Sequence, residues 1–143
     1  MIDLIAFLKT LKPEDWNKTV TSKWTVKDVV AHMVGWEKGD AEAISQIWKT
    51  KTPPWWKTNP NYDEFNAKVI EFYKDYTPEK LIAEWEMWQN KVSEEIDRIG
   101  YHNIKARPDL FDWLLEEDDN YTLNDGGSHY EHHYKQIKKA LER

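Results

Sequence analysis

The sequence has no cysteine, which excludes disulfide bonds, thiolate metal ligands and a cysteine nucleophile. This fits a reducing bacterial-type cytoplasm, and we expect a cytoplasmic protein. No apolar run approaches the ~20 residues of a membrane span, and the N-terminus lacks a signal-peptide pattern, so we expect no membrane partner. An excess of positive charge is missing as well, because the net charge is -6. Binding of nucleic acid usually requires a basic face, so we expect no nucleic-acid partner.

Strand patterns and internal repeats are also missing, whereas apolar side chains recur at helical spacing along most of the chain. The length of 143 residues indicates one domain, residues 1–143, large enough to bury a continuous core. Four main helices and one long connection predict an all-α four-helix bundle. The expected helices cover approximately residues 2–11, 26–47, 62–76, 78–99 and 129–141.

Local signals set the expected helix ends. Thr25 with Asp28 fits an N-terminal capping box, and Thr77 before Pro78 fits a second helix start. Gly100 fits a helix C-cap. Ser128 with Glu131 predicts that the last helix begins just before His129. Asn61 with Glu64 can start the helix after the proline-rich segment 51–61, which reads as a loop, and residues 108–119 could form a further short helix.

Aromatic residues are abundant, with Trp 9, Tyr 7 and Phe 4. They can fill a helical core, or some can wall a pocket for a flat or apolar ligand. Loops with adjacent bulky aromatics often lie over a pocket, but packing against the domain's own side is an equal alternative. The residues considered for such a pocket are Trp36, Trp55, Trp56 and Tyr62.

His129 and His133 lie four residues apart in a segment with helical signals, so their imidazoles share one helix face. Two imidazoles so placed can bind one cation, although such a pair taken alone is more often structural or a solvated patch. His32 lies on the flank of the apolar stripe of an earlier helix. Three inward-facing histidines leave positions open for water or substrate, which is typical of a catalytic metal site. Imidazole ligands suit Zn, Ni, Fe or Mn, and His102, in a loop, is interpreted as a surface residue.

Asp40 lies near the centre of the apolar stripe that begins at Val26. A carboxylate there must be hydrogen-bonded, paired, protonated or open to a water-filled pocket, unless this part of the helix has already left the core. We consider Asp40 and Glu37 as candidate proton-transfer groups, or as groups that support a metal ligand through a hydrogen bond.

Two stretches resemble the DinB/YfiT-like superfamily. WTVKDVVAHMVGWE (24–37) is similar to its second-helix signature, and HYEHH (129–133) is similar to its closing H-x-x-x-H. The resemblance implies an up-down-down-up four-helix bundle in which His32, His129 and His133 correspond to the metal-binding triad. Superfamily members include thiol-dependent transferases and isomerases, and they often pair, so we expect a homodimer. Segment 126–141 and the loop 51–61 are also similar to the ClbS/DfsB branch, which does not keep the second histidine of the pair; the presence of His133 here favours a metal-competent site.

Three hypotheses of function follow. The first is a metal-dependent enzyme acting on a small molecule by hydrolysis or thiol transfer. The second is a metal-independent protein that binds or opens a reactive aromatic compound in a tryptophan-lined pocket, as the ClbS-like resemblance implies. The third is a dimeric interaction module without catalytic activity.

Overall fold

The computed structural model describes residues 4–58, 62–114 and 127–142, without the side chains of residues 57, 58 and 127–131. The described residues form helices and no β-strand; they contain only one isolated β-bridge, between Thr19 and Thr25. The elements are α1 (Leu4–Lys9), the 3-10 helix η1 (Pro13–Asn17), α2 (Val26–Thr50), α3 (Trp55–Thr58), α4 (Tyr62–Tyr73), α5 (Pro78–Ile99), α6 (Tyr101–Lys105), α7 (Pro108–Phe111) and α8 (Gly127–Leu141). The all-α prediction is confirmed. None of the described helices is long and apolar enough to cross a membrane.

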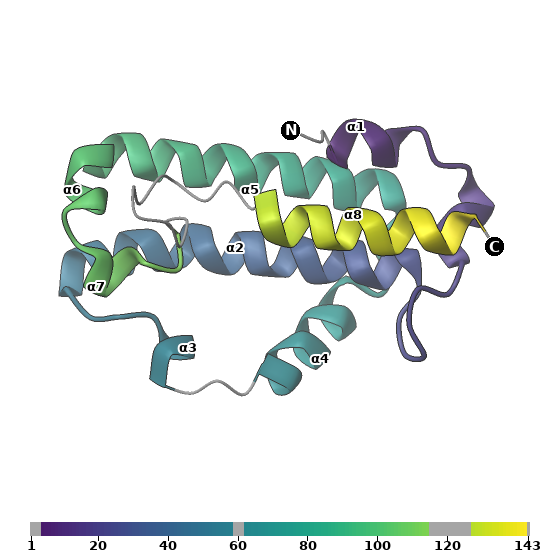
Figure 1. Ribbon diagram of the computed structural model, residues 1–143, viewed down its shortest axis with the longest axis horizontal. Coiled ribbons are helices and arrows are strands. Elements are labelled where there is room, and N and C mark those ends of the chain that lie inside the picture. The colour runs from purple at the N-terminus through teal and green to yellow at the C-terminus, as the bar shows by residue number, and fades with distance from the viewer. Residues whose placement is uncertain (1–3, 59–61, 115–126, 143) are drawn as a thin grey trace.

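The two longest helices, α2 and α5, run parallel side by side (Figure 1). Their first turns share one apolar cluster with α1 and α8, and their last turns share a second cluster with α6 and α7. Parallel neighbours need a long crossover, which here is the segment that carries α3 and α4. Helices α1 and α8 run in the opposite direction (Figure 1). This is the up-down-down-up arrangement that the resemblance implies.

Side chains at the helix ends account for where α2 and α5 begin and stop. The hydroxyl of Thr25 accepts a hydrogen bond from the backbone N–H of Asp28 at 3.3 Å, and the Asp28 carboxylate accepts one from the N–H of Thr25 at 3.0 Å. Thr77 accepts from the N–H of Lys80 at 3.2 Å. Gly100 ends α5 with φ of 97°, a backbone region that favours glycine. The predicted caps at these helix ends are confirmed.

Other predicted boundaries were wrong or fall outside the described residues. The segment 51–61 is not all loop, because its two tryptophans begin the short helix α3. Helix α8 already includes Gly127, so Ser128 lies within its first turn and not at its cap. The short helix expected at 108–119 covers only Pro108–Phe111. Asn61 and residues 115–119 lie outside the described part of the chain.

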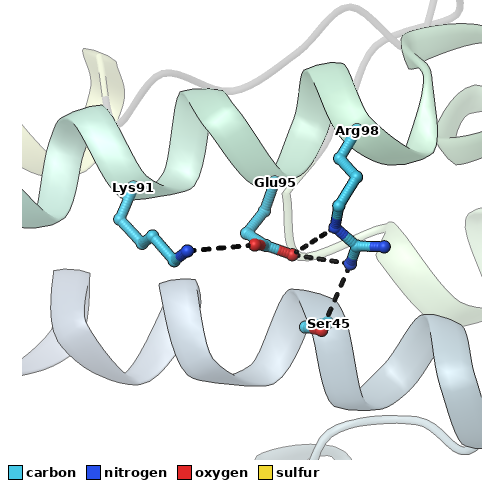
Figure 2. Close-up of polar contacts among 4 residues, drawn as sticks. All are labelled: Ser45, Lys91, Glu95 and Arg98. Atoms are coloured by element: carbon cyan, nitrogen blue, oxygen red, sulfur yellow. Dashed lines mark hydrogen bonds and ion pairs between the residues drawn. The ribbon is translucent and has the colours of Figure 1, made fainter.

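Arg98 of α5 joins a buried carboxylate on the same helix to Ser45 of α2, near the second apolar cluster (Figure 2). Glu95 is 7% exposed, and its Oε2 accepts from Arg98 Nη2 at 2.7 Å and Nε at 3.1 Å. Lys91 lies 3.3 Å from the other oxygen, and Arg98 Nη2 also donates to Ser45 Oγ at 3.2 Å. The hydrogen bonds from Arg98 lower the pKa of Glu95, so this carboxylate stays ionised in the interface.

Helix α4 approaches α2 closely at Gly35. A methyl group at Gly35 would come within 3.0 Å of three carbons of the Val69 side chain. Gly39, one turn later, has more room, because its nearest neighbour would be Phe65 Cζ at 3.7 Å. The close packing of α4 against α2 therefore requires a residue without a side chain at position 35, which is Gly35.

We expect Gly35→Ala to destabilise the fold by about 1–3 kcal/mol, because overpacking against Val69 outweighs the gain in helix propensity. Gly39→Ala is the matched control in the same helix. It should be neutral or stabilise by up to about 1 kcal/mol. Denaturant midpoints of both variants measure the difference, and the double variant Gly35→Ala/Val69→Ala should recover most of the loss. Equal effects of the two single substitutions would contradict the close approach.

Candidate metal centre

Two of the three predicted ligands lie together in the interior. His32 comes from α2 and His133 from α8, and each is 7% exposed. Their ring centroids are 5.2 Å apart, with the ring planes at 77°. Two imidazoles that each bind one ion at 2.0–2.1 Å through a ring nitrogen place their centroids roughly 5 Å apart. The spacing of this pair therefore fits a shared divalent ion.

Each of the two rings has one nitrogen next to an amide oxygen. Nδ1 of His32 lies 3.0 Å from Oδ1 of Asn66, and Nδ1 of His133 lies 2.8 Å from Oε1 of Gln136. Metal-ligating histidines usually donate their second ring N–H to an oxygen in this way. An ion shared by the two rings would then bind through Nε2 of each.

The surroundings of His133 favour the neutral imidazole. Burial lowers its pKa, the charge of His132 lowers it further, and the hydrogen bond with Gln136 opposes them. A metal ligand must be unprotonated, so the lowered pKa helps binding at neutral pH.

The His32 ring is packed against the Trp24 ring at 5.0 Å between centroids.

The third predicted ligand cannot be placed in the same way. Helix α8 includes His129 one turn before His133, but its side chain lies outside the described residues. Among the side chains that the structure describes, no group of three potential ligands forms. The assignment of His129 stays a prediction. His102 is exposed on α6, in keeping with a surface residue.

The four predicted pocket residues gather around one indole. Trp36 stacks with Trp55 at 6.1 Å between centroids, and it meets Trp56 at 5.7 Å and Tyr62 at 5.8 Å. Phe65 is nearer still at 4.4 Å. Trp55 and Tyr62 are 41% and 43% exposed, so this aromatic cluster reaches the surface. Its role as a ligand pocket stays a prediction.

Sequence reasoning missed Asn66, Gln136 and Phe65. Asn66 had a signal, because it is a polar residue on the apolar face of α4 between Tyr62 and Val69. The Asn66 oxygen also accepts a hydrogen bond from Trp36 Nε1 at 2.9 Å. The amide therefore joins the aromatic cluster to His32. Gln136 had no comparable signal, since polar residues are common on an exposed helix.

The candidate acids Asp40 and Glu37 lie further along α2. Both are half-buried, and Asp40 is about 12 Å from His32 along the helix axis, given a rise of 1.5 Å per residue. Burial raises the pKa of Asp40 well above its ordinary range, and the neighbouring charge of Glu37 raises it further. Ile44 and Ile47, further along the same apolar stripe, are buried, so this part of α2 has not left the core, which decides between the two interpretations of Asp40.

We expect Asp40→Asn to stabilise the protein at pH 7 by about 1 kcal/mol, since it removes a carboxylate that resists ionisation. A raised folded-state pKa means that stability is lost as pH rises from the unfolded value of 3.8 through the folded one. The advantage of the variant should shrink on acidification and vanish below about pH 4. Denaturant unfolding across pH measures it, with the exposed Asp97→Asn as control. An advantage that grows at low pH would contradict the raised pKa.

The comparisons with known proteins bear on this arrangement. The family model described as "Mycothiol maleylpyruvate isomerase N-terminal domain" matches residues 1–99. The matched segment contains α1 to α5 and therefore His32, Trp36 and Asn66, but it ends before α8. No curated protein and no solved structure matches the chain. Because the match covers more than half of the sequence, the chain belongs to the mycothiol maleylpyruvate isomerase N-terminal domain family, a family of DinB/YfiT-like helical proteins.

Proposed function

We propose that this protein is a metal-dependent enzyme acting on a small molecule, with a divalent ion held by His32, His133 and His129. The observation that carries the proposal is the buried pair of imidazoles, whose centroids are 5.2 Å apart. Each ring has its Nδ1 beside an amide oxygen, as metal-ligating histidines usually do, and the proposed ion would bind through Nε2. Membership of a DinB-like family supports the same assignment.

The donor set decides which ions are compatible. Imidazole nitrogens without thiolates suit Zn, Ni, Fe or Mn. Such an ion lowers the pKa of a bound water or thiol toward neutrality. The family is named for a mycothiol-dependent isomerase, so a low-molecular-weight thiol is one candidate co-substrate. The reaction is then thiol transfer, or hydrolysis where water takes the place of the thiol.

The acids of α2 are candidates for a proton-transfer step at a part of the substrate away from the imidazoles. Asp40 and Glu37 are one helical turn apart, and the charge of Glu37 raises the pKa of Asp40. Such a pair favours one protonated and one ionised carboxyl group. Asp40 is then the proton donor and Glu37 the acceptor. The distance from His32 along the helix means that they act on a part of the substrate away from the imidazoles.

We expect the wild-type protein to bind about one divalent ion per chain. His133→Ala should weaken binding by more than about 100-fold, because loss of a metal ligand costs more than the 10–100-fold loss caused by removing a residue that only hydrogen-bonds a ligand. His132→Ala is the matched control, since His132 is the exposed neighbour on the same helix. Chelator competition with zinc measures the affinities. Failure of the wild-type protein to bind any loaded metal, or an equal loss in both variants, would refute the proposal.

A second candidate function is supported by the aromatic cluster around Trp36. In this alternative the protein binds a reactive aromatic compound without a metal, as proteins of the ClbS/DfsB branch are expected to do. Trp55 stacks on Trp36 and is 41% exposed, so a flat ligand could pack on its outer face. Asp40, Glu37 and Tyr62 would then matter more than His133.

EDTA-treated protein distinguishes the two candidates. If the second is right, a planar probe such as anilinonaphthalene sulfonate should quench tryptophan fluorescence without metal, and Trp55→Ala should weaken its binding at least about tenfold, the effect of losing one stacking contact of about 1.4 kcal/mol. Tyr101→Ala is the control, because Tyr101 is a similarly exposed aromatic residue on α6. No quenching, or equal losses in both variants, would argue against a metal-free aromatic site.

A further inference from the structure

We infer that Asn66, oriented by Trp36, fixes the tautomer of His32 and is thus a positioning residue of the proposed centre. Its link to metal binding rests on the proposed function. The tautomer itself does not, because it follows from hydrogen bonds among the described residues.

The identity of the Asn66 atom follows from Trp36. An indole Nε1 can only donate a hydrogen bond, and an amide presents either an oxygen acceptor or a nitrogen donor. The atom 2.9 Å from Trp36 Nε1 must therefore be the oxygen. The usual ambiguity between the two ends of an asparagine amide is removed by this one partner.

The same oxygen lies 3.0 Å from Nδ1 of His32. Since an amide oxygen can only accept, His32 Nδ1 must donate and so carries the ring proton. In the neutral ring, Nε2 is then unprotonated and has a lone pair for an ion. Trp36 thus acts on His32 through Asn66, and the aromatic cluster helps to set the chemistry of the imidazole.

Packing of the two helices brings Asn66 within reach. Asn66 lies one turn before Val69, whose side chain occupies the space left by Gly35. Gly35 in turn lies one turn after His32. The close approach of α4 to α2 therefore sets the distance between the amide and the imidazole.

His133 is less constrained. The Gln136 amide oxygen lies 2.8 Å from its Nδ1, but among the described residues no donor-only group holds the Gln136 amide in one orientation. The inference is therefore confined to His32, and Gln136→Ala provides a comparison in which another histidine loses its amide neighbour.

Nitrogen-15 NMR of the metal-free protein tests the tautomer directly. At about pH 8, above the usual histidine pKa of about 6.5, long-range proton–nitrogen spectra distinguish protonated from bare ring nitrogens. His32→Gln identifies the His32 signals by their loss. We expect the wild-type protein to show protonated Nδ1 and bare Nε2 at His32.

Three variants then separate positioning from packing. Trp36→Phe keeps an aromatic ring but removes the indole N–H, so the amide can turn and the tautomers should mix. Asn66→Ala should give the same mixing and weaken zinc binding about 10–100-fold. Adding Asn66→Asp to Trp36→Phe should restore protonated Nδ1, because a carboxylate accepts through either oxygen.

Trp113→Phe is the matched control, since Trp113 Nε1 donates to the Leu110 carbonyl at 2.8 Å, a bond of similar length to that of Trp36. It should leave the His32 tautomer and zinc affinity unchanged. A protonated Nε2 in the wild-type protein, or an unchanged tautomer in both Trp36→Phe and Asn66→Ala, would overturn the inference. The expected tautomers in a protein that binds no metal would support it and would refute the proposed function instead.

Discussion

The arrangement of the site depends on how closely α4 can approach α2. Interior side chains leave few voids, so a helix can move inward only where the opposite surface is small. Gly35 provides that surface, and Val69 fills it. This contact lies next to the candidate site, because Asn66 is one turn before Val69 on α4 and His32 is one turn before Gly35 on α2. A purely steric feature of the packing thus determines a hydrogen bond at the centre of the candidate site.

The choice of an amide beside each imidazole also has a physical consequence. A carboxylate in the same place would fix the tautomer as well, but its charge would raise the pKa of the ring and favour imidazolium. An amide oxygen orients the ring without adding charge. Together with the burial that lowers the pKa of His133, it keeps the imidazole in the state that can bind an ion. The surroundings of the pair are therefore suited to ligation at neutral pH.

The parts of the fold that were predictable from sequence are those set by local interactions. Thr25, Thr77 and Gly100 act within a few residues of their own helix ends, so the sequence shows them directly. The pairing of His32 with His133 is different, since spacing along the chain cannot show that α2 and α8 touch. The helix faces showed only that the histidines point inward, and the resemblance of two stretches to one superfamily supported the expectation that they meet. Asn66 was missed because its two partners lie on another helix, about thirty residues away in sequence.

The family match covers only part of the candidate site, because it ends before α8. Residues 1–99 contain His32, Asn66 and Trp36. The matched segment therefore includes one candidate metal ligand and the two residues that orient it. The second imidazole comes from α8, beyond the matched segment. One histidine cannot hold a divalent ion firmly, because catalytic centres of this type use three protein ligands. In the proposed centre, metal binding would therefore depend on how α8 docks against α2. In the described part of α8 that docking rests on Ile137, fully buried one turn after His133, with Tyr134 and Leu141 packed against the same cluster. The helix that carries His133 is thus held by the same core that forms the bundle.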